Sequence, residues 1–519
     1  MAHFLGIDIG GTVIKSGLYD ERGREKAVAS LNDAPVAGPV GWSERDMRAM
    51  WETVCATVRK ALSEGGVAPA DIRGVGFSAH GKGLYAVDRD GAPVRNGIIS
   101  SDNRALPIVR EWKSRGVDQA AYPYAFQQLW PGHPVSILAW LKRHEADSYR
   151  RIHRILMAHD WIRYCLTGEF AAEITNISGS NLYRVDTGEY EPELFRLFGI
   201  EEMHSCVAPV IGSAECRAGI SAEAAAKTGL PAGTPVYGGF FDVVSAAVCA
   251  GLADGNFINV VMGTWTIETW IADRIHAAAH PYVWGRYCIP GKYFVHEGSP
   301  TSASNLEWFA RTLMPGVERP YQRCDEMVAS LQKGETGISF LPYLFSSNLG
   351  DNLSGGFYGL ANAHGLPHLV QAVYEGICFS QHAHLEHILA LSGQNGALRL
   401  TGGPARSRVW AQMVADIAQM PVEVMHVEES GCLGAAIAAA VGSGVHASFL
   451  EAMAAMCPTA SRLAPDASAA ARYREKYAYF RELAATLNAL PPAVIHGQPL
   501  AIGREARGEI PNSDAGIRP

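Results

Sequence analysis

The chain has 519 residues, of which 48% are hydrophobic and 18% are charged, and its formal net charge is −8. This length exceeds what one hydrophobic core usually supports, so we expect two domains. The negative charge argues against general nucleic-acid binding, which requires a basic surface, but it allows a local pocket for phosphates.

The cysteines and the apolar segments indicate the compartment. Ten cysteines are spread along the chain without a C-x-x-C pair, which is typical of reduced thiols. The N-terminus lacks a secretory pattern. The longest apolar run, residues 434–445, is too short and too rich in Ala and Gly to span a bilayer. We therefore expect a cytoplasmic protein with no membrane partner.

Residues 5–19 predict a β-hairpin with a glycine turn. Its polar and glycine positions are Asp8, Gly10, Gly11, Thr12 and Lys15. Glycines let backbone N–H groups approach a ligand, and a hydroxyl and a cation nearby suit a polyphosphate. A carboxylate before such a turn suits a hydrated Mg2+. The alternative is an ordinary buried hairpin. No P-loop or dinucleotide fingerprint is present at this turn.

A loop in the N-terminal half carries further candidate residues. A predicted helix over 47–62, preceded by an N-cap box at 43–46, leads to strands over 72–78 and 84–88. The loop between these strands holds Ala79, His80 and Gly81, and sites are commonly built on such loops. The alternative, equally open, is a surface hairpin histidine.

The next polar segments leave two interpretations open. Asp102 and Arg104 follow a short strand, where they would either pair with each other or hydrogen-bond sugar hydroxyls. Trp130 would either flank a sugar or belong to the core. Asp160, at the start of a predicted helix over 159–168, is interpreted as scaffold.

Asp242 lies where a short strand meets a helix of small residues, after Gly238 and Gly239. A carboxylate at this junction is close to the positive end of the helix dipole, which favours its ionised form. It can then accept a proton from a substrate hydroxyl. The alternative is a plain helix N-cap.

The hairpin pattern returns at residues 256–271, again as strand, Gly-Thr turn and strand. A repeat at this spacing predicts two equivalent domains that each donate one phosphate-facing hairpin to a central cleft. The predicted fold class is therefore α/β, with the two ribonuclease H-like domains of the actin and hexokinase-like ATPases. The boundary is expected near residue 250.

The C-terminal half ends in regular elements. Strands are predicted over 340–345, 398–401 and 422–427, and helices over 367–379, 409–418, 431–440 and 473–490. His382, His384 and His387 do not share one helix face at this spacing, so a wetted helix surface is favoured over a metal site. Residues 491–519 show no periodicity, and we expect a mobile tail.

From residue 5 to about 490, these motifs together resemble the FGGY family of carbohydrate kinases. The resemblance implies ATP-dependent phosphorylation of the terminal hydroxyl of a ketopentose, with L-xylulose as the expected substrate. It implies that Asp242 is the base and that Asp8 positions Mg2+ through water. The sugar residues implied are Ala79, His80, Gly81, Asp102 and Arg104. The nucleotide residues implied are Gly10, Gly11, Thr12, Lys15, Gly263, Thr264, Gly402, Gly403 and Ser407.

The resemblance also assigns the domains. Residues 1–250 would bind the sugar and residues 251–490 the nucleotide, and a homodimer is common in the family. One departure is Ser407, where many family members carry Asn. Two alternatives stay open: a kinase of the same family for another pentulose or a polyol such as erythritol or glycerol, and a non-catalytic ATP or sugar sensor.

Overall fold

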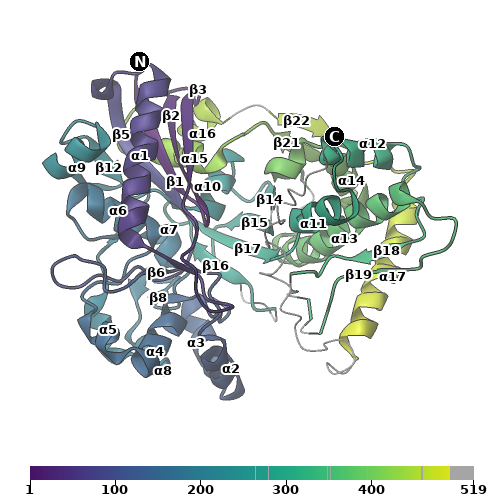
Figure 1. The fold of residues 1–519 in the computed structure, drawn as a ribbon, viewed down its shortest axis with the longest axis horizontal. Helices are drawn as coiled ribbons and strands as arrows, with labels where there is room; N and C mark the ends of the chain where they lie inside the picture. The colour runs from purple at the N-terminus through teal and green to yellow at the C-terminus, as the bar shows by residue number, and fades with distance from the viewer. Residues whose placement is uncertain are drawn as a thin grey trace, which may run out of the picture.

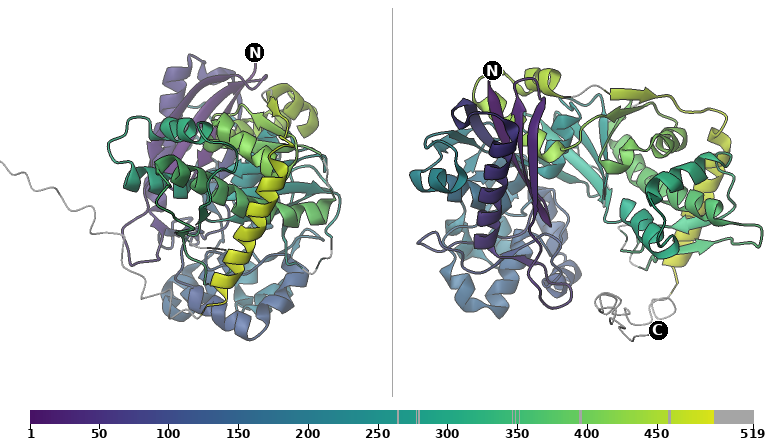
Figure 2. Two further views of the ribbon diagram at one scale, coloured as in Figure 1. Left: turned by 90° about the vertical axis from the view of Figure 1, so that its right-hand side faces the viewer. Right: turned by 45° about the horizontal axis from the view of Figure 1, so that its top comes forward.

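The computed structural model describes residues 1–490, except 264, 277, 279, 346, 348, 351, 394–395 and 458–459. Two halves lie side by side, each built on a seven-stranded sheet with helices packed against it (Figures 1 and 2). The predicted tail over 491–519 lies outside the described residues.

The first sheet belongs to the N-terminal half. Strand β1 pairs antiparallel with β2, which pairs antiparallel with β3, and the other edge of β1 pairs parallel with β5. Strands β12 and β13 both pair parallel with β5, and β11 completes the edge. The strands are β1 (His3–Ile9), β2 (Val13–Asp20), β3 (Glu25–Asn32), β5 (Ile72–Ala79), β11 (Cys216–Gly219), β12 (Pro235–Tyr237) and β13 (Phe240–Phe241).

The second sheet repeats this plan. Strands β14, β15 and β17 are successively antiparallel, whereas β14 pairs parallel with β20, and β20 with β21. Its strands are β14 (Ile258–Met262), β15 (Thr266–Ala272), β16 (Val283–Arg286), β17 (Tyr293–Ser299), β20 (Leu398–Thr401), β21 (Val422–Met425) and β22 (Ala460–Leu463). The predicted repeat and the two-domain α/β fold of the actin and hexokinase-like ATPases are confirmed.

Helices cover the first sheet and extend below it in the view of Figure 1. They are α1 (Met47–Gly65), α2 (Leu106–Ser114), α3 (Val117–Ala125), α4 (Pro134–His144), α5 (Ala146–Arg151), α6 (Ala158–Thr167), α7 (Ile174–Ile177), α8 (Pro192–Leu197), α9 (Ala222–Thr228) and α10 (Asp242–Cys249). The side chain of Asp46, the last residue of the predicted N-cap box, caps helix α1. The box does not cap the helix from its first residue, because residues 44 and 45 form the short strand β4 (Glu44–Arg45).

Most of the helices that follow β17 in the sequence pack on the second sheet. They are α11 (Ala303–Leu313), α12 (Pro320–Ala329), α13 (Leu366–Ser392), α14 (Arg408–Ala418), α15 (Ser430–Gly442), α16 (Phe449–Met456) and α17 (Ala470–Asn488). Short pairs add β6 (Gly97–Ile98) beside β4, β7 (Ala172–Glu173) beside β10 (Val210–Ile211), β8 (Tyr183–Arg184) beside β9 (Glu189–Tyr190), and β18 (Ser339–Leu341) beside β19 (Gly356–Tyr358). Among the described residues, no helix is long and apolar enough to cross a membrane.

Helices α15 and α16 return to the first half, although they follow the second sheet in sequence (Figure 1). A Cβ atom at Gly6 would lie 1.9 Å from the backbone oxygen of Cys432, and one at Gly76 would lie 2.0 Å from that of Ala435. Glycine in β1 and β5 therefore lets α15 pack directly on the sheet. In space, the first half comprises residues 1–250 and this returning segment.

Two predicted strands differ from the structure. The segment over 84–88 forms isolated bridges instead of a strand, because Leu84 pairs with Ile98 whereas Val87 pairs with Pro93 and Arg154. The predicted strand over 340–345 ends early, at residue 341.

Candidate active site

The glycine turn after β1 lies at the same edge of the sheet as the end of β5 and the start of α10. In the register, Asp8 is beside Ser78 of β5, and Ser78 is beside Phe240 of β13. The chain then continues from these three strands to the glycine turn, to His80 and to Asp242. The sheet therefore brings together three segments that the sequence separates widely.

The side chain of Asp8, on β1, lies in an enclosed position against the start of α15. Burial raises the pKa of Asp8 to about 6, although Ser78 and Lys15 nearby oppose the shift. A Cβ atom at Gly431 would lie 2.2 Å from the Asp8 carboxyl carbon. Glycine at the start of α15 therefore leaves the room that the carboxylate fills.

The predicted nucleotide residues of the first hairpin share one turn. The N–H of Gly10 donates to the Val13 carbonyl oxygen at 3.0 Å, while Gly11 and Thr12 are exposed. Lys15 lies opposite Asp8 on β2, but its Nζ forms an ion pair with Glu429 at 2.6 Å. A phosphate group would have to share this ammonium group with Glu429.

Arg45, on β4, contacts this turn, and the sequence did not indicate that contact. Its side chain is 1% exposed, and Nη1 donates to the Gly10 carbonyl oxygen at 2.7 Å. Nη2 donates to the Asp33 carbonyl oxygen at 2.8 Å and pairs with the Asp33 carboxylate. A buried guanidinium group thus fixes the turn from the interior of the protein. Sequence gave no signal for it, because Arg45 is separated from Gly10 by two strands.

Asp242 is the first residue of α10, and the N-cap position is held by Phe241. The side chain is accessible to solvent, yet the surrounding protein raises its pKa to about 7 by desolvation, and the negative charge of Asp8 adds to this shift. Lys82 is the nearby cation that opposes it. Asp242 is therefore a carboxylate poised to take up a proton near neutral pH.

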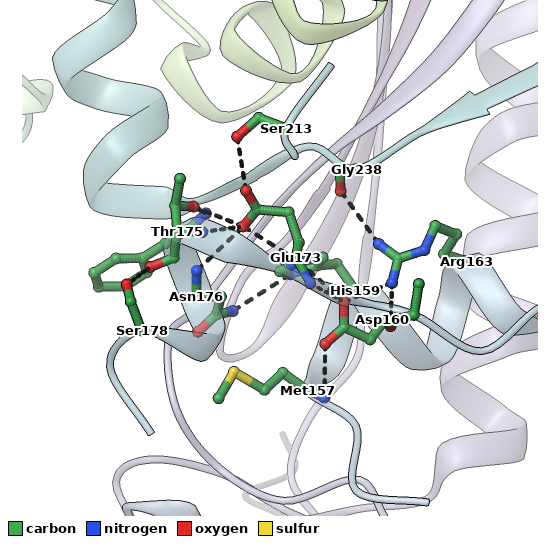
Figure 3. Close-up of polar contacts among 12 residues, drawn as sticks. Met157, His159, Asp160, Arg163, Glu173, Thr175, Asn176, Ser178, Ser213 and Gly238 are labelled. Atoms are coloured by element: carbon green, nitrogen blue, oxygen red, sulfur yellow. Dashed lines mark hydrogen bonds and ion pairs between the residues drawn. The ribbon is translucent and has the colours of Figure 1, made fainter. Parts of the chain in front are cut away.

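A buried polar network supports the loops that carry these groups (Figure 3). Glu173 accepts hydrogen bonds from the hydroxyl group of Thr175 at 2.7 Å and from the backbone N–H of Asn176 at 3.1 Å. The Thr175 hydroxyl group in turn accepts from the Phe241 N–H at 2.9 Å. The Asn176 side chain accepts from the N–H of Lys82 at 3.1 Å. Helix α7 thereby holds the loop after β5 and the start of α10 together.

The same network has a second branch, around Asp160. Asp160 is fully buried and forms an ion pair with Arg163 at 2.8 Å. The guanidinium group also points at the Gly238 carbonyl oxygen, 3.5 Å away, in the turn before β13 (Figure 3). These contacts agree with the scaffold role predicted for Asp160.

The predicted sugar residues separate into two groups. Ala79, His80 and Gly81 lie beside Asp242, and a Cβ atom at Gly81 would lie 2.3 Å from the Phe241 ring. His80 is buried, its Nε2 lies 3.0 Å from the Tyr85 hydroxyl group, and desolvation lowers its pKa to about 3. His80 is thus neutral, and one ring nitrogen is already engaged.

Of the two interpretations left open for Asp102 and Arg104, the structure shows the one in which they pair with each other. Both are buried, with Arg104 Nη2 at 2.8 Å from the Asp102 carboxylate and at 2.7 Å from that of Glu44. The other contacts of the pair are the Ser43 N–H, which donates to Asp102 at 2.6 Å, and the Trp42 ring, 3.9 Å from the guanidinium carbon. The carboxylate is used within the protein, so direct contact of Asp102 with a sugar stays a prediction without geometric support.

Three polar side chains near Asp242 were not among the predicted site residues. Burial lowers the pKa of Lys82 to about 8, and among the described residues it forms no ion pair. His133 is buried and His296 partly buried near Lys82, and desolvation, followed by this positive charge, lowers the pKa of both. They come from the loop before α4 and from β17, so only the fold brings them together.

Trp130 is at the junction of the two halves. Its ring contacts that of Trp265 edge to face, with the centroids 6.4 Å apart. Nε1 of Trp130 donates to the Ser100 carbonyl oxygen at 2.9 Å. Because Trp265 follows the turn between β14 and β15, the second hairpin faces the part of the first half that carries Ser100 and Trp130.

The predicted nucleotide residues of the second half lie at one edge of its sheet. Val261 is beside Thr401 in the parallel pairing of β14 with β20, so Gly263 and Gly402 follow neighbouring strand ends. Gly402 has φ +95°, and Gly402 and Gly403 are exposed. Thr264 lies outside the described residues.

Ser407 has a structural role in addition to the predicted one. Its hydroxyl group accepts from the Trp410 N–H as the N-cap of α14 and donates to Asp325 at 2.7 Å. The Tyr374 hydroxyl group donates to the same Asp325 oxygen at 2.8 Å. A cavity of about 310 Å³ nearby, lined by residues of α12, α13, α14 and α17, contains none of the predicted site residues.

Known proteins share this arrangement. The FGGY family of carbohydrate kinases matches over residues 3–249 with its N-terminal domain and over 258–443 with its C-terminal domain. The chain therefore belongs to the FGGY family and is a carbohydrate kinase that uses ATP.

Individual relatives cover nearly the whole chain. The L-xylulose/3-keto-L-gulonate kinase of Escherichia coli is 46% identical over 486 residues, covering 93% of this chain and 97% of the relative. A probable L-xylulose kinase of Pasteurella multocida is 41% identical, covering 94% of this chain and 100% of the relative. The crystal structure of xylulose kinase from Rhodospirillum rubrum has a TM-score of 0.85 at 26% identity and covers 93% of this chain and 99% of that chain.

Proposed function

We propose that this kinase transfers the γ-phosphate of ATP to the terminal hydroxyl group, O5, of L-xylulose. The names of the two relatives support this substrate, and the position of Asp242 supports the chemistry. The observation that carries the proposal is the shared sheet edge, which aligns Asp242 with the loop of His80 and the turn after Asp8.

The proposed mechanism uses position and charge. The sugar binds to the first half, beside His80 and Lys82, with its terminal hydroxyl group directed at Asp242. ATP binds to the second half at Gly263, Gly402 and Gly403, and the two hairpins enclose its phosphates. Asp242 accepts the hydroxyl proton as the oxygen attacks the γ-phosphorus in line. The bond between the γ-phosphorus and the bridging oxygen breaks, ADP leaves, and closure excludes water.

Asp8 is the proposed contact for Mg2+, through water. The donor chemistry fits, because a carboxylate is the ligand type that Mg2+ prefers, and the enclosed position raises the Asp8 pKa to about 6. A bound cation would neutralise charge on the phosphates of ATP. It would also offset the negative charge that Asp8 exerts on Asp242.

A second candidate substrate is a keto sugar acid, namely 3-keto-L-gulonate, as in the name of the Escherichia coli relative. The observation that favours it is Lys82, whose ammonium group is enclosed near Asp242 and has no ion-pair partner among the described residues. A carboxylate on the substrate would supply that partner. L-Xylulose lacks a carboxylate, so Lys82 would only donate a hydrogen bond to this uncharged sugar.

Steady-state assays of ADP release decide between these substrates. We expect kcat/KM for L-xylulose to exceed that for D-xylulose, L-ribulose, glycerol and erythritol, because a site that hydrogen-bonds particular hydroxyl groups rejects their epimers. Lys82→Met should reduce kcat/KM for 3-keto-L-gulonate far more than for L-xylulose. Faster turnover of erythritol or D-ribulose would contradict the proposed substrate.

We also propose that the kinase works in the cytoplasm, where ATP is available. All ten cysteines are free, which suits a reducing compartment. A homodimer stays a prediction, which light scattering of the purified protein would test.

A further inference from the structure

A cluster of histidines around Glu297 contains none of the predicted sugar or nucleotide residues. His280, Glu297 and His387 come from the loop before β16, from β17 and from α13, and each offers one ligand atom within 4.8 Å of the others. Their side chains are 34%, 9% and 38% exposed. Three segments distant in sequence therefore converge on one partly open point.

The ligand atoms are arranged around the Glu297 carboxylate. His280 Nε2 contacts one carboxylate oxygen, and His387 Nδ1 lies 3.5 Å from the other. The His280 and His387 rings are 4.3 Å apart between centroids. Ligands of a tetrahedral zinc ion are separated by about 3.3 Å, given bond lengths of about 2.0–2.1 Å. Small side-chain rotations would bring the three atoms around one ion.

Neighbouring groups hold the Glu297 side chain and the His387 backbone in place. His384 is buried, and its Nδ1 lies 3.1 Å from the Glu297 carboxylate. The hydroxyl group of Tyr282 donates to the His387 carbonyl oxygen at 2.8 Å, which ties the His280 loop to α13. Such outer contacts orient the ligands of metal sites.

His387 contacts Glu297 at ion-pair distance only. Its Nδ1 is buried and has no hydrogen bond of good geometry among the described residues. The expected wetted surface was wrong for this part of α13, because His384 is 2% exposed and packs against β17. His382 points elsewhere, toward the Tyr477 ring, 4.9 Å away between centroids.

We propose that His280, Glu297 and His387 bind a divalent transition-metal ion, with Zn2+ as the best fit. Two imidazole nitrogens and one carboxylate oxygen are donors that zinc accepts, whereas Mg2+ prefers oxygen alone. The partial exposure of both histidines leaves a side on which water completes the coordination. The site is distinct from the proposed Mg2+ position at Asp8.

The ion would tie together three segments of the second half, one of which also contacts the first half. The loop that carries His280 accepts hydrogen bonds from the first half, because the Gln128 side chain donates to the Pro281 carbonyl oxygen at 2.7 Å. The Tyr122 hydroxyl group donates to the Tyr282 carbonyl oxygen at 2.8 Å. Metal binding would thus fasten this loop to α13 and β17, and we expect it to raise the melting temperature.

The test uses full-length protein that has been treated with EDTA and dialysed. Zn2+ binding is measured by calorimetry, and Co2+ binding by its visible absorption. We expect the wild-type protein to bind one ion. His387→Ala and His280→Gln should each weaken the affinity for this ion at least tenfold and abolish the metal-dependent rise in melting temperature. His382→Ala is the matched control, since it removes a histidine from the same helix without touching the cluster.

Two results would overturn the proposal. One is wild-type protein that binds neither ion, which would leave the cluster as a set of histidine–glutamate ion pairs. The other is equal zinc affinity in the His280, His382 and His387 variants, which would place the ion elsewhere, for example on exposed Cys216. If His387→Ala does not fold, His280→Gln, in an accessible loop, decides alone.

Discussion

Nη1 of Arg45 lies 2.7 Å from the backbone oxygen of Gly10, so one buried side chain fixes the turn on which the candidate phosphate contacts depend. The same guanidinium group binds Asp33 through both the backbone and the carboxylate. The position of the turn is therefore set from the interior, independently of any ligand.

We expect Arg45→Met to lower both stability and activity. Removing one partner leaves the Asp33 carboxylate and the Gly10 carbonyl oxygen without their buried donor, which typically costs about 3–5 kcal/mol in the free energy of unfolding. Urea titration measures this loss. The KM for ATP should also rise in the fraction that stays folded, because the turn loses its anchor. An unchanged KM would show that Arg45 matters for stability alone.

Asp242→Asn separates a catalytic base from a helix cap. General-base assistance is typically worth about 10² to 10⁴ in rate, so kcat should fall by that factor. Sugar affinity should fall far less, because Asn keeps the shape and still forms hydrogen bonds. Since Phe241 holds the N-cap position, no cap is lost. Rapid-quench and calorimetric measurements on one preparation check both values, and near wild-type kcat would remove Asp242 from the mechanism.

Two glycine substitutions distinguish contact with ATP from a need of the fold. A Cβ atom at Gly11 meets nothing within 4 Å, whereas one at Gly402 would lie 2.1 Å from the Met262 carbonyl oxygen. Gly402 also has φ +95°, which side chains rarely adopt. We expect Gly11→Ala to keep the melting temperature but to raise the KM for ATP, and Gly402→Ala to lower the melting temperature. Normal ATP kinetics in Gly11→Ala would argue against phosphate contact there.

The sequence was sufficient for the fold because the decisive signals are local and repeated. Each Gly-Thr turn between two apolar strands marks one ribonuclease H-like half, and Asp242 is next to a glycine pair at a strand end. In the structure, the register of β1, β5 and β13 places Asp8 near the start of α10.

Contacts made only by long-range packing could not be predicted in this way. Asp102 and Arg104 have the composition of a sugar site, yet Glu44, far away in sequence, completes a buried ion-pair cluster with them. His296 and Lys82 are neighbours because β17 reaches the first half. Helix α15 covers the first sheet after the chain has built the second, so the order of residues alone gave a simpler division at residue 250.

The raised pKa of Asp242 predicts two opposite pH dependences. Desolvation by the surrounding protein and, secondarily, the charge of Asp8 raise this pKa from 3.8 to about 7. A base must be ionised, so kcat/KM should fall about tenfold per pH unit below that pKa.

Stability changes in the other direction. Between pH 3.8 and about 7 the folded protein keeps a proton on Asp242 that the unfolded chain has released, so unfolding releases a proton. The contribution of this group to stability is thus complete below pH 3.8 and is lost as the pH rises through about 7. Asp242→Asn removes this loss, so its melting temperature relative to the wild type should rise from pH 5 to pH 8. Scanning calorimetry in matched buffers checks the difference, and a gap that stays constant with pH would show that the Asp242 pKa is not raised.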